Sequence, residues 1–254
     1  MNPWDIHIAK NTVQGTNARD RAKRNLMNRL SHQIPGILSY HDVDIDGVQQ
    51  NIVIINSDNL NKKTLCSLPG EDIRHGALVD WEGYRWLVTE RDANTEIYTK
   101  CIMEQCNYLL RWVDVDSKEI IERWCIVEDG TKYLTGEFAD RDMVMLRGDA
   151  RIQLIISKDD YTLRFGRNSR FIIDDYDSPE PLAYRMTKPY KLGGSFDKDG
   201  VLRFVLTECN TEDDDNLELH IADYYTYFPK EEPDGISNQE PAQPSSNNER
   251  RVWI

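Results

Sequence analysis

The chain has 254 residues, 39% hydrophobic and 30% charged, with a net charge of −13. This length fits one large or two modest domains. No apolar run approaches the roughly 20 residues that span a bilayer, so we expect no membrane segment. The N-terminus lacks the basic and apolar regions of a secretory signal, so we expect a protein made in the cytoplasm.

The charge is divided unevenly along the chain. Residues 1–33 carry six basic and two acidic residues, a net charge of +4, so the remainder carries −17. A chain this acidic is a poor general binder of nucleic acid, because affinity for phosphates comes from Lys and Arg. The short basic segment is suited to an acidic protein partner.

Motifs that carry chemistry are missing from the sequence. The five cysteines form no C-x-x-C pair and the five histidines are dispersed. Reduced thiols are the main interpretation, and a zinc site is the minority one. No nucleophile elbow, phosphate-binding loop or dinucleotide motif occurs. We therefore expect no cofactor and no enzymatic activity.

The N-terminal region reads as an arm followed by a helix. Residues 2–11 form a short strand or an arm lying on a neighbour, and Thr16 or Asn17 caps a helix that ends near Gln33. Its basic residues are candidate partner-binding residues: Arg19, Arg21, Lys23, Arg24 and Arg29. A solvated face of an ordinary amphipathic helix is the alternative, and a helix docked on an acidic partner is the functional interpretation.

Hairpin signals dominate the next hundred residues. Asp46-Gly47 separates two alternating runs, and Glu82-Gly83 separates Leu78–Trp81 from Tyr84–Val88. Gly after an acidic residue permits the positive φ angles of a two-residue turn. With further strands at 96–103 and 108–115, the pattern predicts a small antiparallel β-barrel.

The polar stretch from Asn56 to Arg74 is expected to be a nineteen-residue loop. Loops of this length in compact domains are often functional. We take it as a pore-occluding or subunit-joining loop with the candidate residues Asn59, Lys62, Lys63, Leu65 and Leu68. The alternative is that it hides a strand at 64–68.

The second half predicts short strands at 8–12-residue spacing, at 143–146, 151–157, 161–165, 170–173, 182–187, 201–206 and 217–221. Such spacing is typical of an immunoglobulin-like sandwich. From residue 229 the composition is that of a flexible tail, and its apolar tip is a candidate handle for a partner: Val252, Trp253 and Ile254. The predicted domains are thus 1–36, 37–138, 139–228 and 229–254.

Two acidic groupings have metal-binding alternatives. The run from Glu212 to Asp215, with Glu218, lacks the turning glycine of a calcium loop and is mainly interpreted as a solvated loop. Asp42, Asp44 and Asp46 alternate, as in a two-metal nuclease, but no supporting Lys or Glu motif is nearby. We take them as solvent-facing charges that block aggregation at a strand edge.

Three segments resemble proteins encoded among the head–tail genes of tailed bacteriophages of Gram-positive hosts. They are G-x-L-V-x-W-x-G-x-x-W-L-V-T-E at Gly76–Glu90, CNYLLRW at Cys106–Trp112 and KPYKLGG at Lys188–Gly194. The first half is similar to the head-closure, or stopper, type of neck protein, a small β-barrel with a long loop that assembles as a ring below the portal. Small stoppers have no second β domain and no tail, and this chain departs from them in both.

The resemblance implies a structural virion protein at the phage neck that joins head to tail and helps retain and pass the genome. It implies a homo-oligomeric ring of six or twelve copies that contacts portal or adaptor and tail-terminator proteins. DNA would pass through the lumen without sequence-specific binding, repelled by the acidic remainder. A tail, baseplate or capsid-surface protein is the first alternative, and a carboxylate-metal nuclease or a glycan hydrolase is the second.

Overall fold

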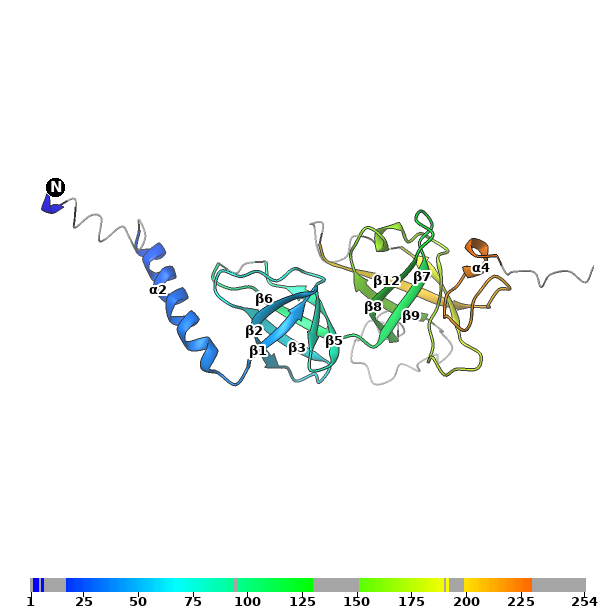
Figure 1. The fold of residues 1–254 in the computed structure, drawn as a ribbon, viewed down its shortest axis with the longest axis horizontal. Helices are drawn as coiled ribbons and strands as arrows, with labels where there is room; N and C mark the ends of the chain where they lie inside the picture. The colour runs from blue at the N-terminus through cyan, green and yellow to red at the C-terminus, as the bar shows by residue number, and fades with distance from the viewer. Residues whose placement is uncertain are drawn as a thin grey trace, which may run out of the picture.

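The computed structural model describes residues 2–4, 6, 17–93, 96–129, 151–189, 191 and 199–229. A helix, a closed barrel and a second, curled sheet follow one another along the long axis (Figure 1). The predicted mainly β fold with an N-terminal helix is therefore confirmed. The predicted tail lies outside the described residues, apart from Pro229.

The first body is a closed antiparallel barrel in which the strand order is β1-β2-β3-β6-β5-β4. Pairing of β1 with β4, with Ile45 opposite Val79, closes it. Its strands are β1 (Tyr40–Ile45), β2 (Val48–Asn56), β3 (Lys62–Ser67), β4 (Leu78–Trp81), β5 (Tyr84–Arg91) and β6 (Lys100–Gln105). A closed barrel has no free strand edge, so other chains can meet it only through side chains, turns and arms.

The two predicted hairpin turns form as expected. Asp46 and Gly47 have φ angles of 51° and 83°, and Glu82 and Gly83 have 51° and 80°. Asp44 Oδ1 accepts a hydrogen bond of 2.6 Å from the amide of Gly47, which fixes the first turn. Inward-facing apolar residues of the strands fill the barrel: Val43, Ile45, Ile52, Ile54, Leu65, Val79, Val88 and Met103.

The prediction of a long loop between Asn56 and Arg74 is wrong. Its middle part, residues 62–67, is strand β3, which pairs with β2 on one side and β6 on the other. The alternative of a hidden strand at 64–68 was the better interpretation. The strand is polar on its outward face and needs only Leu65 in the core, so its apolar signal in the sequence is weak.

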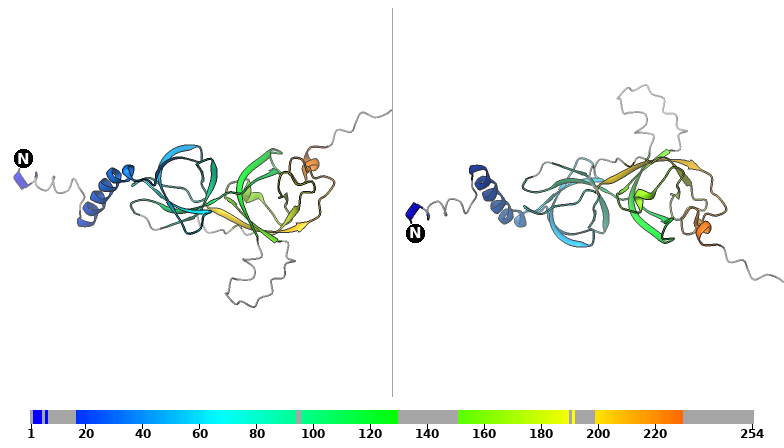
Figure 2. Two further views of the ribbon diagram at one scale, coloured as in Figure 1. Left: turned by 90° about the horizontal axis from the view of Figure 1, so that it is seen from below. Right: turned by 90° about the horizontal axis from the view of Figure 1, so that it is seen from above.

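The second body is one antiparallel sheet in which the strand order is β10-β11-β12-β9-β8-β7. Its strands are β7 (Tyr108–Val113), β8 (Ile120–Asp129), β9 (Arg151–Ser157), β10 (Arg170–Ile172), β11 (Ala183–Lys188) and β12 (Val201–Cys209). Figure 2 shows that the sheet curls around its core. Within the described residues, these strands form a single curled sheet rather than the two facing sheets of the predicted immunoglobulin-like sandwich.

Tyrosines occupy the gap between the outer strands of this sheet. Tyr108 donates a hydrogen bond of 3.1 Å to the carbonyl of Ile172, the last residue of β10. Tyr176 donates one of 2.9 Å to the carbonyl of Leu109 in β7, and its ring stacks on that of Tyr108 at 5.5 Å. These contacts shield the two sheet edges, which otherwise expose unpaired backbone groups.

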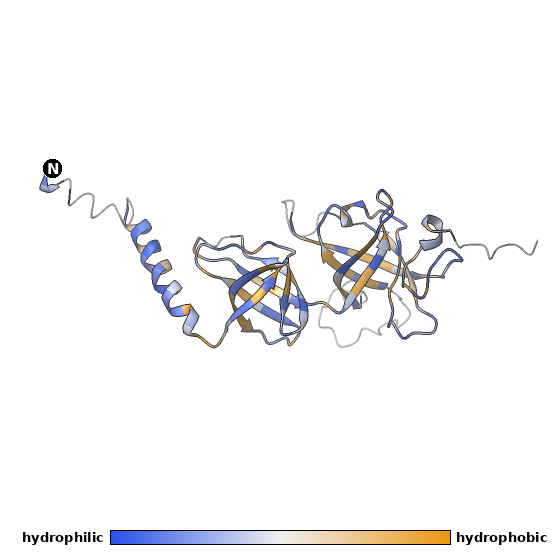
Figure 3. Ribbon diagram, in the orientation of Figure 1, coloured by the Kyte–Doolittle hydropathy of each residue, from blue (hydrophilic) through white to orange (hydrophobic). Residues whose placement is uncertain are grey.

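Three phenylalanines and a tryptophan form the centre of the second core. The ring of Phe165 meets those of Trp112 and Phe171 edge-on, with both centroid distances at 4.9 Å, and that of Phe204 at 5.9 Å. Figure 3 shows hydrophobic residues concentrated on the sheets, whereas the N-terminal helix is hydrophilic over most of its length.

Two predicted strands in this body are wrong. Residues 161–165 contain the short helix η2 (Thr162–Arg164), and residues 217–221 form a turn closed by a bridge between Asn216 and Ile221. A short helix α4 (Tyr224–Tyr227) follows. The predicted strand at 143–146 lies outside the described residues.

The predicted barrel limit at residue 138 is also wrong. β7 and β8 belong to the second sheet, so the change from one body to the other falls directly after Gln105. Leu87 and Cys106 pack against Ile126, Ile155 and Val201, which joins the two bodies through an apolar contact. The aromatic strands of both bodies follow one another without a break, and the sequence pattern gave no signal for this limit.

Backbone contact between the bodies depends on a glycine. Gly76 has a φ angle of 81°, and a Cβ placed there would overlap the carbonyl group of Gly200. Ser157 Oγ donates a hydrogen bond of 2.7 Å to the carbonyl of Gly76. No larger residue fits this approach without moving one of the two bodies.

Candidate interaction surfaces

The N-terminal helix α2 (Ala18–Gln33) carries all five candidate basic residues. Asn17 caps it as predicted, because its side chain accepts a hydrogen bond of 2.8 Å from the amide of Asp20. A short turn of 3₁₀ helix, η1 (Ile34–Gly36), ends it. No residue of α2 is buried, so the helix gains little from packing within its own chain.

Contacts from α2 to the barrel are few. Arg19 forms an ion pair with Glu96, and Lys23 Nζ lies 4.0 Å from the same carboxylate. Met27 lies next to Gly70. Exposed ion pairs of this kind contribute about 1 kcal/mol or less each. The helix is thus an arm held loosely to the loops before β4 and β6.

The five candidate residues of the predicted loop between Asn56 and Arg74 do not form one surface. Asn59 lies in the β2–β3 turn, Lys62 and Lys63 begin β3, and Leu65 is fully buried in the barrel core. Leu68 follows the strand and is partly buried. A strand paired on both sides cannot swing into a pore, so the gating role expected for this stretch is withdrawn.

A cleft that the sequence did not predict lies where the barrel meets the second sheet. It has a volume of about 400 Å³ and its lining includes Asn59, Asn61, Lys62, Glu104, Asn107 and Glu128. Buried Glu104 accepts hydrogen bonds of 2.7 Å from Lys62 Nζ and 3.0 Å from Thr89 Oγ1. Glu104 is thus paired with two side chains of its own chain, and we interpret this network as structural.

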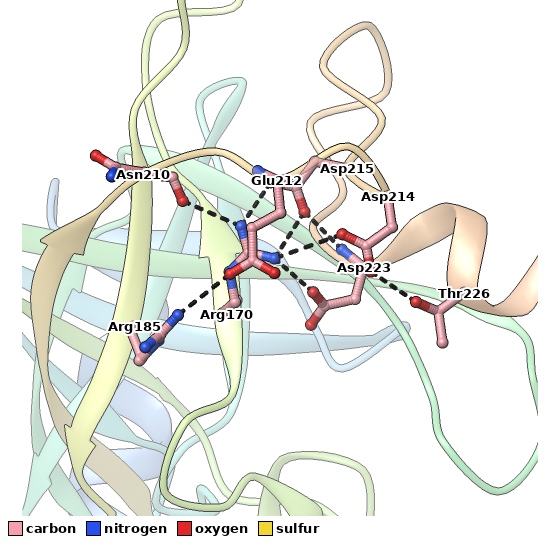
Figure 4. A network of polar contacts seen from close by, with 8 residues as sticks. All are labelled: Arg170, Arg185, Asn210, Glu212, Asp214, Asp215, Asp223 and Thr226. Carbon is pink, nitrogen blue, oxygen red and sulfur yellow. Dashed lines mark hydrogen bonds and ion pairs between the residues drawn. The ribbon is translucent and has the colours of Figure 1, made fainter.

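A buried arginine organises the acidic run of the second body (Figure 4). The side chain of Arg170 is 5% exposed and donates hydrogen bonds of 3.0 and 2.6 Å to the two carboxylate oxygens of Asp215, which is fully buried. It also donates one of 2.6 Å to Asp223. Glu212 and Asp214 lie 3.4 and 3.8 Å from the guanidinium.

The electrostatics of this cluster follow from one buried cation among four carboxylates. Burial alone would lower the pKa of Arg170, but its hydrogen bonds and charge contacts with Asp215 and Asp223 raise the pKa. Burial raises the pKa of Asp223 although Arg170 opposes it. The expected solvated acidic loop is therefore wrong for Asp215, whose partner is 45 residues away in the sequence.

The geometry of the acidic cluster gives little support to the calcium-binding alternative. Glu212, Asp214 and Asp223 place ligand atoms within 4.8 Å of one another, the one such group among the described residues. Arg170 already supplies a positive charge there, and Asp215, which the calcium alternative needs, is bound to it. We interpret the cluster as a structural clamp that ties β10 to the loop after β12.

The aspartates of the nuclease alternative have structural partners. Asp44 caps the first turn. Asp46 Oδ2 accepts hydrogen bonds of 3.1 and 2.9 Å from Arg74, and Asp46 Oδ1 accepts one of 2.9 Å from the amide of Leu78. Asp42 and Asp44 do face outward from β1, as the sequence predicts for solvent-facing charges.

Three of the five cysteines, Cys101, Cys106 and Cys125, and two of the histidines, His75 and His220, are buried. All five cysteines are free, as the reduced-thiol interpretation predicts. Burial raises the pKa of Cys101 and Cys106 to about 12. Burial lowers the pKa of His75 and His220. A thiol that stays protonated is a poor nucleophile and a poor metal ligand.

Val252, Trp253 and Ile254 lie outside the described residues, so the candidate handle at the tail stays a prediction. Within the described part of the chain, no helix is long and apolar enough to cross a membrane.

These features define a class: an antiparallel β protein with a closed barrel, an adjoining curled sheet and a basic helical arm. Residues 11–105 match the model of a family described as the YomX N-terminal domain. YomX is a protein of the SPβ phage region of Bacillus, so the match is to a phage-associated family and indicates a phage protein. No curated protein and no solved structure matches the chain.

The limits of this match agree with the structure. It spans α2 and the whole barrel and ends at Gln105, the last residue of β6. The unit shared with the family is thus the arm plus barrel, and the second sheet lies beyond the matched residues.

Proposed function

We propose that the protein is a structural component of a tailed-phage virion, of the head-closure type, which forms a ring in the neck. It joins head to tail and helps to retain and pass the genome, without catalysing a reaction. The phage-associated match over the arm and barrel carries the proposal. The protein is made in the cytoplasm of the bacterial host and acts in the particle.

The architecture supports assembly through arms and surfaces. The barrel is closed and offers no strand edge, so joining copies requires projecting elements. α2 is such an element, because it extends from the barrel with no residue buried (Figure 1). The proposed partners are six or twelve copies of the chain itself, a portal or adaptor ring, and tail-terminator proteins.

The charge balance supports passage of DNA without binding. The −17 net charge outside residues 1–33 repels phosphates, and DNA would slide along a hydrated wall of the lumen. Sequence-specific contacts have no part in this role. With β3 built into the barrel, closure would come from the ring as a whole or from a neighbouring protein.

A second candidate is a tail, baseplate or capsid-surface protein. The observation that favours it is the second sheet, a separate body with its own core beyond the matched barrel. Such a body is suited to decorating a surface, whereas a minimal closure ring needs only the barrel.

Removal of the gene from its phage, with complementation in trans, tests the proposal. Particles without the protein should package DNA but lose it from tailless heads, and the wild-type gene should restore infectivity. Intact, DNA-filled heads with attached but inactive tails would favour the second candidate. Normal, infectious particles would contradict both.

A further inference from the structure

The helix α2 packs only weakly against its own chain. It has 16 residues, none of them buried, and helices of this length are marginal in water without tertiary packing. The segment that joins it to β1 exposes two apolar side chains, Ile37 at 45% and Leu38 at 100%. Exposed apolar residues beside a loosely held helix indicate a surface that another chain covers.

The net positive charge of α2 indicates that its partner surface is acidic. Residues 18–33 contain five basic residues and one acidic residue, whereas the barrel residues 37–105 contain twelve acidic and six basic ones. The chain thus carries a basic arm and an acidic body. A second copy of the same chain offers the complementary charge without any other component.

The outer face of β1 and β4 is the best matched part of that body. Asp42 and Asp44 point outward from β1, and Asp44 stands directly opposite Asp80 of β4. Glu82 continues the acidic row in the β4–β5 turn. Like charges opposite one another in an antiparallel pair are unfavourable. Arg85 forms an ion pair with Asp80 and so offsets one charge of this row.

We propose that α2 of one copy docks on the acidic outer face of β1 and β4 of the next copy. The face is defined by Asp42, Asp44, Asp80 and Glu82. This contact rests on the proposed ring and names the surfaces that build it. Each chain gives one arm and receives one, so the contact is head-to-tail and closes into a ring when the rotation between copies allows it.

The position of α2 in its own chain favours a second copy as the owner of this face. Within the chain, Arg19 and Lys23 meet Glu96 in the loop before β6, and Met27 meets Gly70 in the loop before β4. Neither loop belongs to the outer face of β1 and β4. The segment 37–39 links the helix to β1 and leaves it free to project from the barrel.

Charge reversal in the full-length chain tests the contact. The arm variant is Arg21→Glu/Arg29→Glu, and the face variant is Asp42→Arg/Glu82→Arg, which changes two exposed residues. The control Arg167→Glu/Arg203→Glu makes the same charge change as the arm variant on the exposed surface of the second body. Circular dichroism and thermal melting verify that all three fold.

Sedimentation velocity over a range of micromolar concentrations measures the association. The arm and face variants should each associate about tenfold or more weakly than the wild type, because like charges now meet. The control should associate as the wild type does. An equimolar mixture of arm and face variants should regain the association, since each reversed arm then meets a reversed face.

The outcomes separate the contact from the ring. A wild type that associates while both variants associate equally well retains the ring and overturns the docking contact. Variants that lose association and regain nothing on mixing also overturn the docking contact. A wild type that stays monomeric contradicts the ring itself, and the docking contact with it.

Discussion

Replacing Arg170 tests the interpretation of the acidic cluster as a structural clamp. Arg170→Met leaves Asp215, which has no exposed side-chain surface, as a buried charge without its cation. Breaking a buried ion pair from one side costs about 3–5 kcal/mol. With an m-value of about 2–3 kcal/mol/M, the urea midpoint of the second body falls by about 1–2.5 M.

Arg185 provides the matched control. It pairs with Glu212 at 3.2 Å in the same cluster, but its side chain is 43% exposed. Arg185→Met should therefore cost about 1 kcal/mol or less. The double variant Arg170→Met/Asp215→Asn removes the uncompensated charge and keeps an acceptor oxygen, so it should recover part of the loss.

The assay is urea unfolding followed by tryptophan fluorescence and circular dichroism. Equal losses for the Arg170 and Arg185 variants would refute the clamp. Added Ca²⁺ or Mg²⁺ should not shift the midpoint of the wild type, because Arg170 already occupies the centre of the carboxylates. A large shift with either ion would favour a metal site instead.

Three further predictions concern other parts of the fold. Gly76→Ala should destabilise the protein by several kcal/mol, because the added Cβ overlaps the backbone of Gly200. Gly83→Ala, at a similar φ angle but in open space, should cost only about 1–2 kcal/mol. Thermal melts compare the two variants, and equal losses of stability would contradict the close approach. Burial lowers the pKa of His75 and His220, so their contribution to stability is complete above the unfolded pKa, and stability should fall as the pH drops below about 6.5. His75→Gln/His220→Gln should flatten this drop in thermal melts, and an unchanged profile would refute this origin. Asn17→Ala should destabilise α2 by about 1 kcal/mol and reduce the helical signal in circular dichroism. The main unfolding transition should stay where it is, because no residue of α2 is buried. A large shift of that transition would show that α2 packs in the free chain.

Local features of the fold were predictable from the sequence because their causes are local. Asp46-Gly47 and Glu82-Gly83 adopt the positive φ angles that such turns require. Asn17 caps the helix through a side chain three residues from its partner. Strand β9 has the predicted bounds, 151–157, because its apolar run stands between clear turn signals.

Features set by distant residues were not predictable in this way. β3 has polar outward residues, and its place between β2 and β6 decides that it is a strand. The limit between the two bodies depends on which strands β7 and β8 pair with, and both limits would give the same alternating pattern. Arg170 and Asp215 find each other only in the folded chain.

The positions of the candidate interaction residues were predictable in part, and their role in binding stays a prediction. The basic residues of α2 were identified from their charge, and the structure adds that the helix buries none of them. The acidic row across β1 and β4 needs the pairing of Asp44 with Asp80, which closes the barrel and joins residues far apart in sequence.

Cryo-electron microscopy of intact phage particles, focused on the neck, tests the central claim most directly. The account predicts a symmetric ring of this barrel on the head–tail axis, with α2 of each copy on β1 and β4 of the next. Density for the barrel on the shell or along the tail would contradict the closure role. Absence of the protein from purified particles would contradict the structural role altogether.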